Sequence, residues 1–453
     1  MKVLLVRPRP HKQTIGLQHV MICEPLELEY LVSNVPEELK SSVDVKIVDM
    51  ILEKKDYKEI LLDEKPDFIL FTGYITHVGI IKMLAKSAKL LLPGVMTGVG
   101  GVHAEVVCED FQSEHIDFIY SKSGIDGFNL TLKMLLESCD AEKIKAELVK
   151  IKKNCTFNYK YPDRSSVSRY RRKYYYMFHS PCALIKTSFG CPYSCSFCFC
   201  KEVTDGKYFS RTMEDVVNEL ENIAEEEVYI VDDDFLFNKD NLRLFIDLIK
   251  EKNIQKKYLV YGRADFIANN ADMVAELKSV GLQAVIVGIE SVRTQDLLDY
   301  NKNTTKEINE KCIKILRALD IELYATLIIP LDFSKMNFDE LTRWLKKLNV
   351  RFVNLQPLTP LPGTEIFESY TSKLLVSREE HELWDMAHVV LKPEHMSIRQ
   401  FYFNLLKSYY RVIMRPKHMW FLIKKYGIKS NLKMLLGSSL VSFQYIQKIV
   451  RGR

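Results

Sequence analysis

Short runs of apolar residues, mostly β-branched or leucine-rich, alternate with longer amphipathic stretches along the first 140 residues of the chain. These runs predict strands at 2–6, 43–48, 67–71, 94–98 and 116–119, and the amphipathic stretches predict helices near 24–39, 76–91 and 126–137. Strands that alternate with helices form parallel sheets with crossover connections. We therefore expect residues 1–140 to form an α/β domain with a doubly wound sheet.

The same alternation resumes between residues 183 and 357. It predicts strands near 183–188, 228–231, 257–262, 283–288, 321–328 and 351–356, separated by helices at 212–225, 239–252, 270–279, 304–318 and 337–347. Six strands with five crossovers fall short of a closed eight-stranded barrel. The pattern predicts a partial (β/α)6 barrel at 181–370, preceded by a linker at 141–180.

The remaining residues, 371–453, are predicted to form a helical and aromatic C-terminal region. From residue 407 onward, basic residues alternate with large apolar ones and no acidic residue occurs. One interpretation is a helical lid that covers the mouth of the barrel and exposes a basic face to solvent. The other is a region that lies on an anionic membrane surface. Both stay open at this point.

Composition and charge set limits on the function. A chain of 453 residues that is 47% hydrophobic is long enough for several folded domains. The net charge of +5 is mild, so domain packing is favoured over nucleic-acid binding for the Arg- and Tyr-rich run at 169–176, and no nucleic-acid partner is expected. The chain begins directly with a predicted strand and contains no long apolar span, so we expect neither a signal peptide nor a membrane span.

Three cysteines lie directly after the predicted strand at 183–188. Cys191, Cys195 and Cys198 have C-x3-C-x2-C spacing, and three thiolates suit an iron–sulfur cluster with one iron left open for a ligand that is not protein. A zinc loop completed by Cys200 is the alternative, and with it a metal-stapled binding module without enzymatic activity. The other cysteines are scattered along the chain, which indicates free thiols and a reducing, cytoplasmic setting.

The cysteine run, its place after a strand and Phe197 before the last cysteine resemble the radical S-adenosylmethionine enzymes. The resemblance implies a [4Fe–4S] cluster held by Cys191, Cys195 and Cys198, with S-adenosylmethionine on the open iron and Phe197 near it. It also implies that one electron from the reduced cluster breaks the sulfonium bond to give a 5′-deoxyadenosyl radical. An electron donor such as flavodoxin or ferredoxin is therefore expected.

Three further motifs follow predicted barrel strands and resemble the family pattern. Asp232, Asp233 and Asp234 stand where relatives receive the amino group of S-adenosylmethionine, although an N-cap for the following helix is an alternative and both can hold together. Arg263 could pair with the methionyl carboxylate, with the substrate or with Asp265. Glu290 and Ser291 would face the ribose hydroxyls or the methionyl carboxylate, because a bound polar ligand is the simplest compensation for a buried glutamate.

Loops at Arg7–Pro10, Thr72–Thr76 and Thr97–His103 follow strands of the N-terminal sheet, where ligands of such sheets bind. Their glycines lack the spacing of a dinucleotide fingerprint. Together with the run Glu24–Leu31, the order of these loops resembles the flavodoxin-like cobalamin-binding domain of a radical enzyme subgroup that includes hopanoid methylases and an anaerobic chlorophyll-ring cyclase. The cobalamin contacts implied by this resemblance are Pro8, Thr72, Gly73, Tyr74, Thr76, Gly98, Gly100, Gly101 and His103.

Two departures from the resemblance matter. The Asp-x-His-x-x-Gly element that supplies a histidine ligand to cobalt in other cobalamin proteins is absent, so His77 and His103 are assigned no ligand role and are read as structural or as contacts to the cobalamin tail. The segment Ile328–Asp332 replaces the usual Gly-Leu-Pro-Gly loop, which leaves that part of the substrate pocket undefined. The Pro-rich run Gln356–Glu365, in contrast, looks like the exit loop of the cobalamin subgroup.

The resemblance as a whole implies a cobalamin-dependent enzyme that methylates an unactivated carbon. One S-adenosylmethionine would methylate cobalt and a second would give the radical, which removes a substrate hydrogen before the carbon takes the methyl group from methylcobalamin. The alternative is cyclisation, rearrangement or oxidation with the same cofactors. A small-molecule or lipid-like substrate and peripheral membrane contact of the C-terminal basic region are expected, and no catalytic proton donor is assigned.

Overall fold

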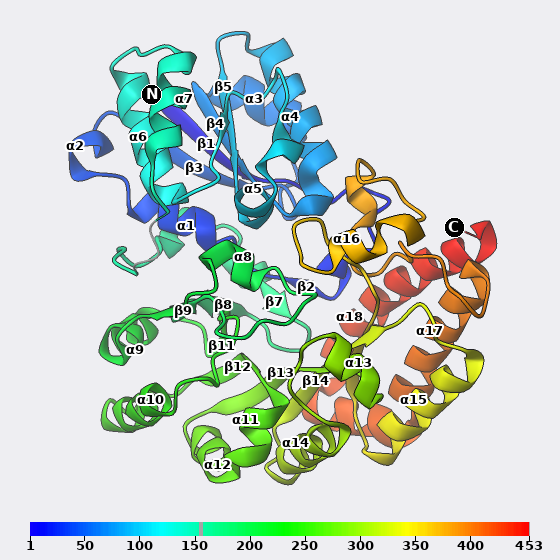
Figure 1. The fold of residues 1–453 in the computed structure, drawn as a ribbon. Helices are drawn as coiled ribbons and strands as arrows, with labels where there is room; N and C mark the ends of the chain where they lie inside the picture. Colours follow the sequence, from blue (N-terminus) through cyan, green and yellow to red (C-terminus); the bar gives the residue numbers. More distant parts are fainter. Residues whose placement is uncertain (154–156, 453) are drawn as a thin grey trace. The chain divides into compact units, whose positions relative to one another are not determined.

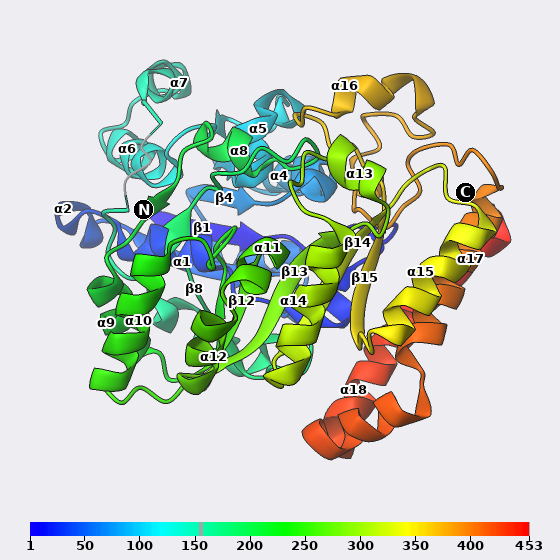
Figure 2. The same ribbon diagram turned by 60° about the horizontal axis from the view of Figure 1, so that its bottom comes forward.

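The computed structural model describes residues 1–153 and 157–452, and these form two compact units (Figures 1 and 2). Unit 1 comprises Met1–Thr14, Glu24–Lys173 and Arg378–Asp385. Unit 2 comprises Ile15–Cys23, Tyr174–Ser377 and Met386–Arg453. Each unit therefore contains a short segment from a part of the chain that otherwise builds the other unit.

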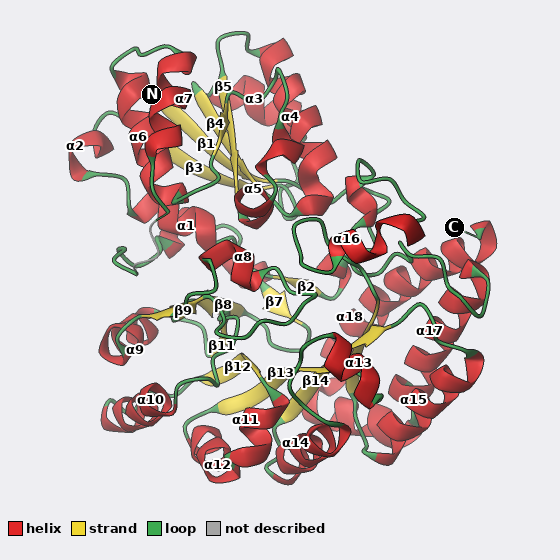
Figure 3. Cartoon of the chain, viewed as in Figure 1, coloured by secondary structure: helices red, strands yellow, loops and turns green. Residues whose placement is uncertain are grey.

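Unit 1 contains a five-stranded parallel sheet with the order β3-β1-β4-β5-β6 (Figure 3). Its strands are β1 (Lys2–Arg7), β3 (Asp44–Asp49), β4 (Phe68–Thr72), β5 (Met96–Gly100) and β6 (Phe118–Ile119). Every residue of the central strand β4 is buried, because helices cover both faces of the sheet. The chain winds outward from β1 in both directions, which confirms the predicted doubly wound fold.

The helices of unit 1 follow the amphipathic stretches of the sequence. They are α1 (Leu26–Ser33), α2 (Glu37–Lys40), α3 (Tyr57–Glu64), α4 (Val78–Leu91), α5 (Val102–Val106), α6 (Gly124–Leu136) and α7 (Ala141–Lys150), with 3-10 turns η2 (Ile75–His77), η3 (Cys108–Phe111), η4 (Arg164–Val167), η5 (Arg171–Lys173) and η7 (His381–Leu383). Helix α7 and turns η4 and η5 fall within the stretch predicted as a linker. Most of 141–180 is thus part of unit 1.

The segment Arg378–Asp385 is fixed within unit 1 by polar contacts. The Arg378 guanidinium lies 3.2 Å from carboxylate oxygens of both Glu109 and Asp110. The Thr14 hydroxyl donates a 2.9 Å hydrogen bond to the backbone carbonyl of Glu382. A late segment of the chain therefore completes the N-terminal fold.

Unit 2 is built on a six-stranded sheet with the order β15-β14-β13-β12-β11-β8, in which all neighbours are parallel. The strands are β8 (Cys182–Ile185), β11 (Glu227–Ile230), β12 (Lys257–Gly262), β13 (Leu282–Glu290), β14 (Glu322–Ile329) and β15 (Phe352–Pro357). The outer strands β8 and β15 do not pair with each other, so the barrel is open. This confirms the predicted partial (β/α)6 barrel.

Smaller elements complete unit 2. Its helices are α8 (Cys200–Thr204), α9 (Met213–Asn222), α10 (Lys239–Glu251), α11 (Ala264–Asn269), α12 (Ala271–Ser279), α13 (Thr294–Asp299), α14 (Lys306–Ala318), α15 (Lys335–Lys347), α16 (Phe367–Tyr370), α17 (Ile398–Ile413) and α18 (Pro416–Arg451), with 3-10 turns η1 (Leu17–His19) and η6 (Thr371–Lys373). Two short antiparallel pairs join β2 (Met21–Ile22) to β7 (Tyr175–Tyr176) and β9 (Ser188–Phe189) to β10 (Phe209–Ser210).

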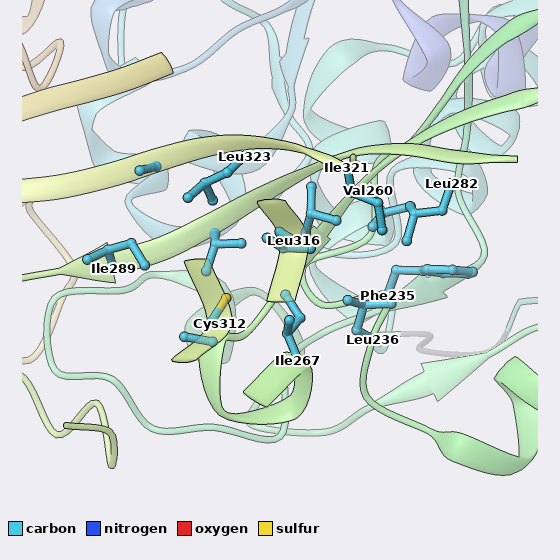
Figure 4. Packing of buried hydrophobic residues seen from close by; sticks show 14 of the residues in the cluster. Phe235, Leu236, Val260, Ile267, Leu282, Ile289, Cys312, Leu316, Ile321 and Leu323 are labelled. Carbon is cyan, nitrogen blue, oxygen red and sulfur yellow. The ribbon is translucent and has the colours of Figure 1, made fainter. Parts of the chain in front are cut away.

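The outer helices of the barrel begin at side chains that cap them. Thr212, Asn238, Thr305 and Ser334 each accept hydrogen bonds from the first turn of α9, α10, α14 and α15, respectively. Because Asn238 caps α10, the N-cap alternative for Asp232–Asp234 is wrong. The apolar faces of these helices pack on the sheet, as Figure 4 shows for Leu316 and its neighbours.

The Arg- and Tyr-rich run at 169–176 is used for packing. Tyr170 is buried in unit 1, where its hydroxyl donates a 2.7 Å hydrogen bond to Glu53. Tyr174 and Tyr175 are buried in unit 2. The rings that would stack on nucleic-acid bases are therefore withdrawn from solvent.

Helices α17 and α18 pack at the edge of the barrel sheet. Helix α17 runs antiparallel beside the edge strand β15, because the Tyr409 hydroxyl bonds to both backbone groups of Leu355 and Arg415 donates to the carbonyl of Val350. Helix α18 then packs against α17. An aromatic, amphipathic helix can cover an exposed sheet edge as well as a barrel mouth. The sequence pattern alone therefore does not distinguish these two positions. None of the described helices has the length and apolar content that a bilayer crossing requires.

We expect substitution of Leu316 by Ala to destabilise unit 2 by about 2–5 kcal/mol, because Leu316 is fully buried between α14 and the sheet and its removal leaves a cavity. Leu298, which is 66% exposed, provides the control: Leu298→Ala should change stability by less than about 0.5 kcal/mol. Urea denaturation followed by circular dichroism measures both. Equal losses for the two variants would contradict the packing described here.

Candidate functional site

The three cysteines lie on one loop between β9 and α8, at the end of the barrel where the parallel strands finish. Gly190 begins this loop with a φ of 80°, and a Cβ atom there would lie 2.0 Å from the carbonyl oxygen of Lys207. The Gly190 N–H donates a 3.0 Å hydrogen bond to the Asp233 carboxylate. Only glycine fits this turn, so backbone geometry and one carboxylate together fix the direction of the loop.

The thiols of the loop are partly buried and differ in acidity. Burial raises the pKa of Cys191 to about 12, and burial also raises that of Cys195 although Lys302 and Arg263 oppose it. A hydrogen bond with the Cys200 thiol lowers the pKa of Cys198. The Cys200 thiol in turn lies 3.5 Å from Asp233. Thiols with raised pKa values become ligands when a positively charged metal centre stabilises their thiolates.

The aspartate run after β11 divides into three different environments. Asp232 accepts hydrogen bonds from the backbone N–H groups and the hydroxyls of Thr187 and Ser188, so it joins β11 to β9. Asp233 holds Gly190, as described above. Asp234 is 2% exposed, and no described side chain donates a hydrogen bond to its carboxylate oxygens, although the backbone of Leu236 interacts with the carboxyl. The resemblance predicts one common role for these three residues, whereas only the Asp234 carboxylate has no described side chain bonded to it.

Burial raises the pKa of Asp234 to about 7, although the positive charges of Arg263 and Lys302 lower it. A buried carboxyl without a partner is unfavourable unless a ligand supplies a donor. An ammonium group would satisfy both oxygens and restore the charged form. The position of this carboxyl therefore favours a cationic nitrogen as its ligand.

Arg263 is fixed at the end of β12 by several contacts. Its guanidinium pairs with Asp265 at 3.0 Å, donates to the carbonyl of Lys302 at 2.7 Å and stacks on the Tyr193 ring at 3.8 Å. One of its nitrogens also lies 4.0 Å from the Cys195 sulfur. Of the three partners considered from the sequence, Asp265 is the one in place. The guanidinium nevertheless borders the cysteine loop.

A buried ion pair joins Lys302 to Glu290, with 2.9 Å between Nζ and Oε1. Both side chains are less than a tenth exposed. Burial alone would lower the pKa of Lys302, but the Glu290 carboxylate and Cys195 raise it above its usual value. The partner expected for the buried glutamate was a bound ligand, and this expectation is corrected here because Lys302 already supplies the opposite charge.

Gly288 makes room for this pair. A Cβ atom on Gly288 would lie 2.1 Å from the Glu290 carboxylate and 2.7 Å from the Lys302 ammonium. Glu290 itself has a φ of 58°, at a point where the register between β13 and β14 shifts. The run Gly288-Ile-Glu290 therefore forms a bulge that turns the carboxylate toward Lys302. Sequence reasoning missed Lys302, since it lies in a loop without a strand-end signal.

Ser291 is fully used by the protein. Its hydroxyl donates to Asp296 at 2.5 Å and accepts from the Arg293 N–H at 3.0 Å. Arg293 also forms a two-pronged ion pair with Asp332, at 2.8 Å for each hydrogen bond. Asp332 ends the segment Ile328–Asp332, so this pair fixes the loop that departs from the family pattern. Ser291 acts in the structure as an anchor for the turn after β13.

Two further contacts shape the cysteine loop. The Phe197 ring packs edge-on against Tyr300, with 5.6 Å between centroids. The Pro-rich run after β15 approaches the loop, because Ile366 N donates to the Ser196 carbonyl and Lys201 pairs with Glu365 at 2.9 Å. The exit loop and the cysteine loop are therefore neighbours within unit 2.

In unit 1, the strands β1, β4 and β5 are adjacent, and the loops that follow them carry most of the residues expected to contact cobalamin. Gly101 has a φ of 103°, and a Cβ atom there would lie 3.0 Å from the Gly73 carbonyl and 3.1 Å from the Thr72 hydroxyl. The structure thus brings the loops that contain Thr72, Gly73, Gly100 and Gly101 together at one edge. Gly98 differs, since it lies inside β5 against Tyr120 and Phe68.

The remaining expected contacts lie on the same edge or close to it. Pro8 follows β1 directly, and Tyr74 is 61% exposed after β4. Thr76 lies in turn η2, whose His77 accepts a hydrogen bond from the Tyr74 N–H at 3.2 Å. Burial lowers the pKa of His77 to about 4, so this histidine is neutral.

His103 is engaged by the protein itself. Its Nε2 lies 2.8 Å from the Asp110 carboxylate, which also contacts Arg378. Burial lowers the pKa of His103, although Asp110 opposes this effect. The ring nitrogen nearest Asp110 is thus already bonded, which supports the structural interpretation of His103.

The residues fit the cofactors implied by the sequence. Three thiols on one loop would provide the donor set of a cluster with one open iron, and the carboxyl of Asp234, to which no described side chain bonds, would offer a place for the amino group of S-adenosylmethionine. In unit 1, the close approach of Gly73 and Gly101 leaves backbone rather than side chains at the edge of the sheet, where a large planar ligand needs space.

Loss of the Lys302 charge should destabilise the protein even without cofactors, since it leaves Glu290 buried and unpaired. We expect Lys302→Met to lower the free energy of unfolding by about 3–5 kcal/mol, and the double substitution Lys302→Met with Glu290→Leu to recover most of it. The control is Lys314→Met, which removes an exposed pair with Glu310 at 3.8 Å and should change stability by less than about 1 kcal/mol. Thermal and urea denaturation test the cycle, and additive losses in the double variant would contradict the pairing.

Substitution of Asp234 by Asn tests the buried carboxyl. The folded protein binds the proton of this carboxyl more tightly than the unfolded chain does. The free energy of unfolding of the wild type therefore falls as the pH rises from the ordinary pKa near 4 toward the raised value of about 7. The free energy of unfolding of Asp234→Asn, relative to that of the wild type, should therefore increase by about 1.4 kcal/mol for each pH unit in this window. Denaturation of the cofactor-free proteins at several pH values measures the gain. A pH-independent difference between Asp234→Asn and the wild type would contradict the raised pKa of Asp234.

Comparison with known proteins agrees with the geometry. The model of the radical SAM superfamily matches residues 185–354, which include the cysteine loop and all the strand-end motifs. The model of the B12 binding domain matches residues 20–130, which include the loops after β4 and β5. Together the two matches span more than half of the chain.

Individual relatives cover most of the chain. The hopanoid C-3 methylase of Methylococcus capsulatus is 26% identical, over 92% of this chain and 81% of that protein. The anaerobic magnesium-protoporphyrin IX monomethyl ester cyclase of Rubrivivax gelatinosus is 21% identical, over 96% of this chain and 81% of that protein. A bacteriochlorophyllide d C-8(2)-methyltransferase of Chlorobaculum tepidum is 26% identical over about half of each chain, 49% and 52%.

Two solved structures share the fold. The radical S-adenosylmethionine methyltransferase TsrM of Kitasatospora setae superposes with a TM-score of 0.64 at 16% identity, over 92% of this chain and 91% of that one. The cobalamin-dependent S-adenosylmethionine radical enzyme OxsB superposes with a TM-score of 0.67 at 14% identity, over 96% of this chain and 72% of that one. The chain therefore belongs to the cobalamin-dependent radical S-adenosylmethionine enzymes, whose cofactors are a [4Fe–4S] cluster, S-adenosylmethionine and cobalamin.

Proposed function

We propose that this enzyme methylates an unactivated carbon atom of a small-molecule or lipid-like substrate. The observation that carries the proposal is the buried carboxyl of Asp234, which has no partner among the described side chains and lies at the same barrel end as the three-cysteine loop. A site that can hold an ammonium group next to a cluster suits S-adenosylmethionine. Similarity to a hopanoid C-3 methylase and a bacteriochlorophyllide methyltransferase supports methyl transfer as the outcome.

The proposed roles of the barrel residues follow from their contacts. Cys191, Cys195 and Cys198 would hold the cluster, and Phe197 would line the space next to it. Asp234 would accept the amino group of S-adenosylmethionine, while Asp232 and Asp233 keep the cysteine loop in place through Ser188 and Gly190. These assignments divide the aspartate run into one binding residue and two positioning residues.

Three charged residues would complete the binding site for S-adenosylmethionine, with Ser291 supporting one of them. Arg263 and the Lys302–Glu290 pair would face its carboxylate and ribose, and Ser291 would hold the turn that carries Glu290. When bound, the cluster and S-adenosylmethionine supply the radical that removes a substrate hydrogen, and cobalamin supplies the methyl group. The protein groups bind and orient these partners.

Cobalamin would bind at the carboxyl edge of the unit 1 sheet. The proposed contacts are Pro8, Thr72, Gly73, Tyr74, Thr76, Gly100 and Gly101, while Gly98 would support the site through the packing of β5 and His103 through its bond to Asp110. No histidine is proposed as a lower ligand of cobalt. His77 is held by its own turn, and His103 already bonds to Asp110.

The second candidate is cyclisation, rearrangement or oxidation without methyl transfer. Similarity to the magnesium-protoporphyrin cyclase of Rubrivivax gelatinosus favours this alternative. The two candidates use the same cofactors and differ in the fate of the methyl group of S-adenosylmethionine. Isotope labelling of that methyl group therefore separates them.

We also propose the partners and the setting. A reduced flavodoxin or ferredoxin would supply the electron, and no nucleic acid takes part. Buried cysteines that form no disulfide among the described residues, such as Cys312, suit the cytoplasm, as does an oxygen-sensitive cluster. The basic C-terminal region would make peripheral contact with a membrane, which brings the enzyme close to a lipid-like substrate.

We expect the enzyme, purified anaerobically with cobalamin, to convert S-adenosylmethionine to both S-adenosylhomocysteine and 5′-deoxyadenosine, and to transfer a deuterated methyl group from S-adenosylmethionine to a product. Mass spectrometry of products formed from anaerobic lipid and small-molecule extracts measures the transfer. Formation of 5′-deoxyadenosine with unlabelled product would favour the second candidate. Absence of 5′-deoxyadenosine under reducing conditions would contradict both.

The cluster assignment has its own control. Cys198→Ala should lower iron and sulfide content and abolish 5′-deoxyadenosine formation, because the loop loses one of its three thiols. Cys108→Ala changes an exposed thiol of unit 1 and should leave iron content and both products unchanged.

A further inference from the structure

Helix α18 has apolar residues on two faces. One face is buried in unit 2 through Met434, Gly437 and Tyr445, and a Cβ atom on Gly437 would lie 2.0 Å from the carbonyl oxygen of His19. Gly427, with a φ of 73°, separates this long second part of the helix from a short first part. The residues on the opposite face of the second part are much more exposed than those on the buried face.

That opposite face forms a continuous apolar stripe. Its members are Ile428, Leu432, Leu435, Leu436, Leu440, Phe443, Ile446 and Val450, which are between 44% and 75% exposed. They recur every three or four residues over about six helical turns, so they share one side of the helix. Ten of the 27 large hydrophobic residues that are exposed in the described chain lie in α18. A contiguous surface of this kind marks an interaction site.

The charge around the stripe is of one sign. Helix α18 contains seven Lys and Arg residues and no Asp or Glu. Lys429 falls at the edge of the stripe, because successive residues turn by about 100° around the helix. Lys424 and Lys429 are both exposed, whereas Lys425 pairs with Glu322 at 2.6 Å and Lys433 stacks on Tyr175 at 3.5 Å. The border of the stripe therefore carries one exposed lysine, Lys429, and a second exposed lysine, Lys424, lies in the first part of the helix, before Gly427.

This charge decides between two occupants of the stripe. A second copy of the same helix would bring lysines against lysines, and α18 offers no acidic residue to pair with them. An anionic bilayer offers both an apolar interior for the stripe and phosphates for the lysines. The exposed Trp420 in the first part of the helix is also a residue type that favours membrane interfaces.

We propose that α18 docks the enzyme on an anionic lipid bilayer, with the stripe inserted among the acyl chains near the headgroups and Lys424 and Lys429 bound to lipid phosphates. This inference deepens the proposed function and rests on it for the lipid-like class of substrate. In this proposal, membrane contact depends on insertion of the apolar stripe of α18 as well as on its basic charge. Docking itself requires no turnover.

The test uses the purified full-length protein and vesicles of phosphatidylglycerol and phosphatidylcholine in equal parts. The wild type should co-sediment with these vesicles, and less with phosphatidylcholine alone or at high salt. The triple substitution of Leu432, Leu436 and Phe443 by Ser should weaken binding at least about tenfold. Lys424→Gln and Lys429→Gln should each weaken it by about fivefold.

A matched control removes similar exposed apolar surface from unit 1. Leu62, Met83 and Leu90 are 53%, 57% and 73% exposed, close to the 55%, 62% and 57% of Leu432, Leu436 and Phe443. Their triple substitution by Ser should leave vesicle binding unchanged. Equal binding by the two triple variants, or binding indifferent to phosphatidylglycerol, would overturn the proposal. So would a wild-type dimer in light scattering that becomes a monomer in the α18 variant, because a second copy would then cover the stripe.

The same variants separate docking from catalysis. Formation of S-adenosylhomocysteine and 5′-deoxyadenosine without vesicles should be equal in the wild type and in the α18 variant. Vesicle binding without these products would contradict the proposed function and leave docking intact. If the wild type forms both products but does not bind vesicles, docking is contradicted and the proposed function remains intact.

Discussion

The buried pair of Lys302 and Glu290 is the interaction on which the candidate site depends. Two opposite charges withdrawn from water at the end of a barrel persist only as a pair, because either one alone would be unstable there. The pair exists because Gly288 has no side chain and because β13 bulges at Glu290. Arg263 holds the backbone of Lys302 and stacks over Tyr193 in the cysteine loop. Charge, backbone shape and cluster loop are therefore coupled through a few residues at one strand end.

The order of elements could be predicted because each strand and each helix leaves a local pattern. The buried strand β4 reads as an uninterrupted apolar run, and the outer helices of the barrel begin at Thr, Asn or Ser caps. The cysteine loop was visible for a different reason, since its three cysteines lie within eight residues. These signals are short-range, so they survive in a single sequence.

The missed features are long-range. Lys302 forms an ion pair with Glu290, twelve residues earlier, because β13 bulges at Glu290. No local sequence pattern predicts this bulge. Asp232, Asp233 and Asp234 look alike in the sequence, yet Asp232 bonds to Thr187, Asp233 bonds to Gly190, and Asp234 bonds to no described side chain. The place of α17 beside β15 rather than over the mouth depends on Tyr409 meeting Leu355. Each of these outcomes requires knowledge of which distant residue becomes a neighbour.

The composition of the two units has a consequence for synthesis of the protein. Unit 1 is completed by Arg378–Asp385, which the ribosome makes more than 200 residues after the last large segment of that unit, Glu24–Lys173. Unit 2 is also built from separated segments: Ile15–Cys23 is made near the start of translation, and Tyr174–Ser377, on which it packs, is made much later. The five strands of the N-terminal sheet are all made by residue 119, but unit 1 lacks the segment that contains turn η7 until the barrel strands have been translated. Fragments cut at the usual domain boundaries would each lack a piece of themselves.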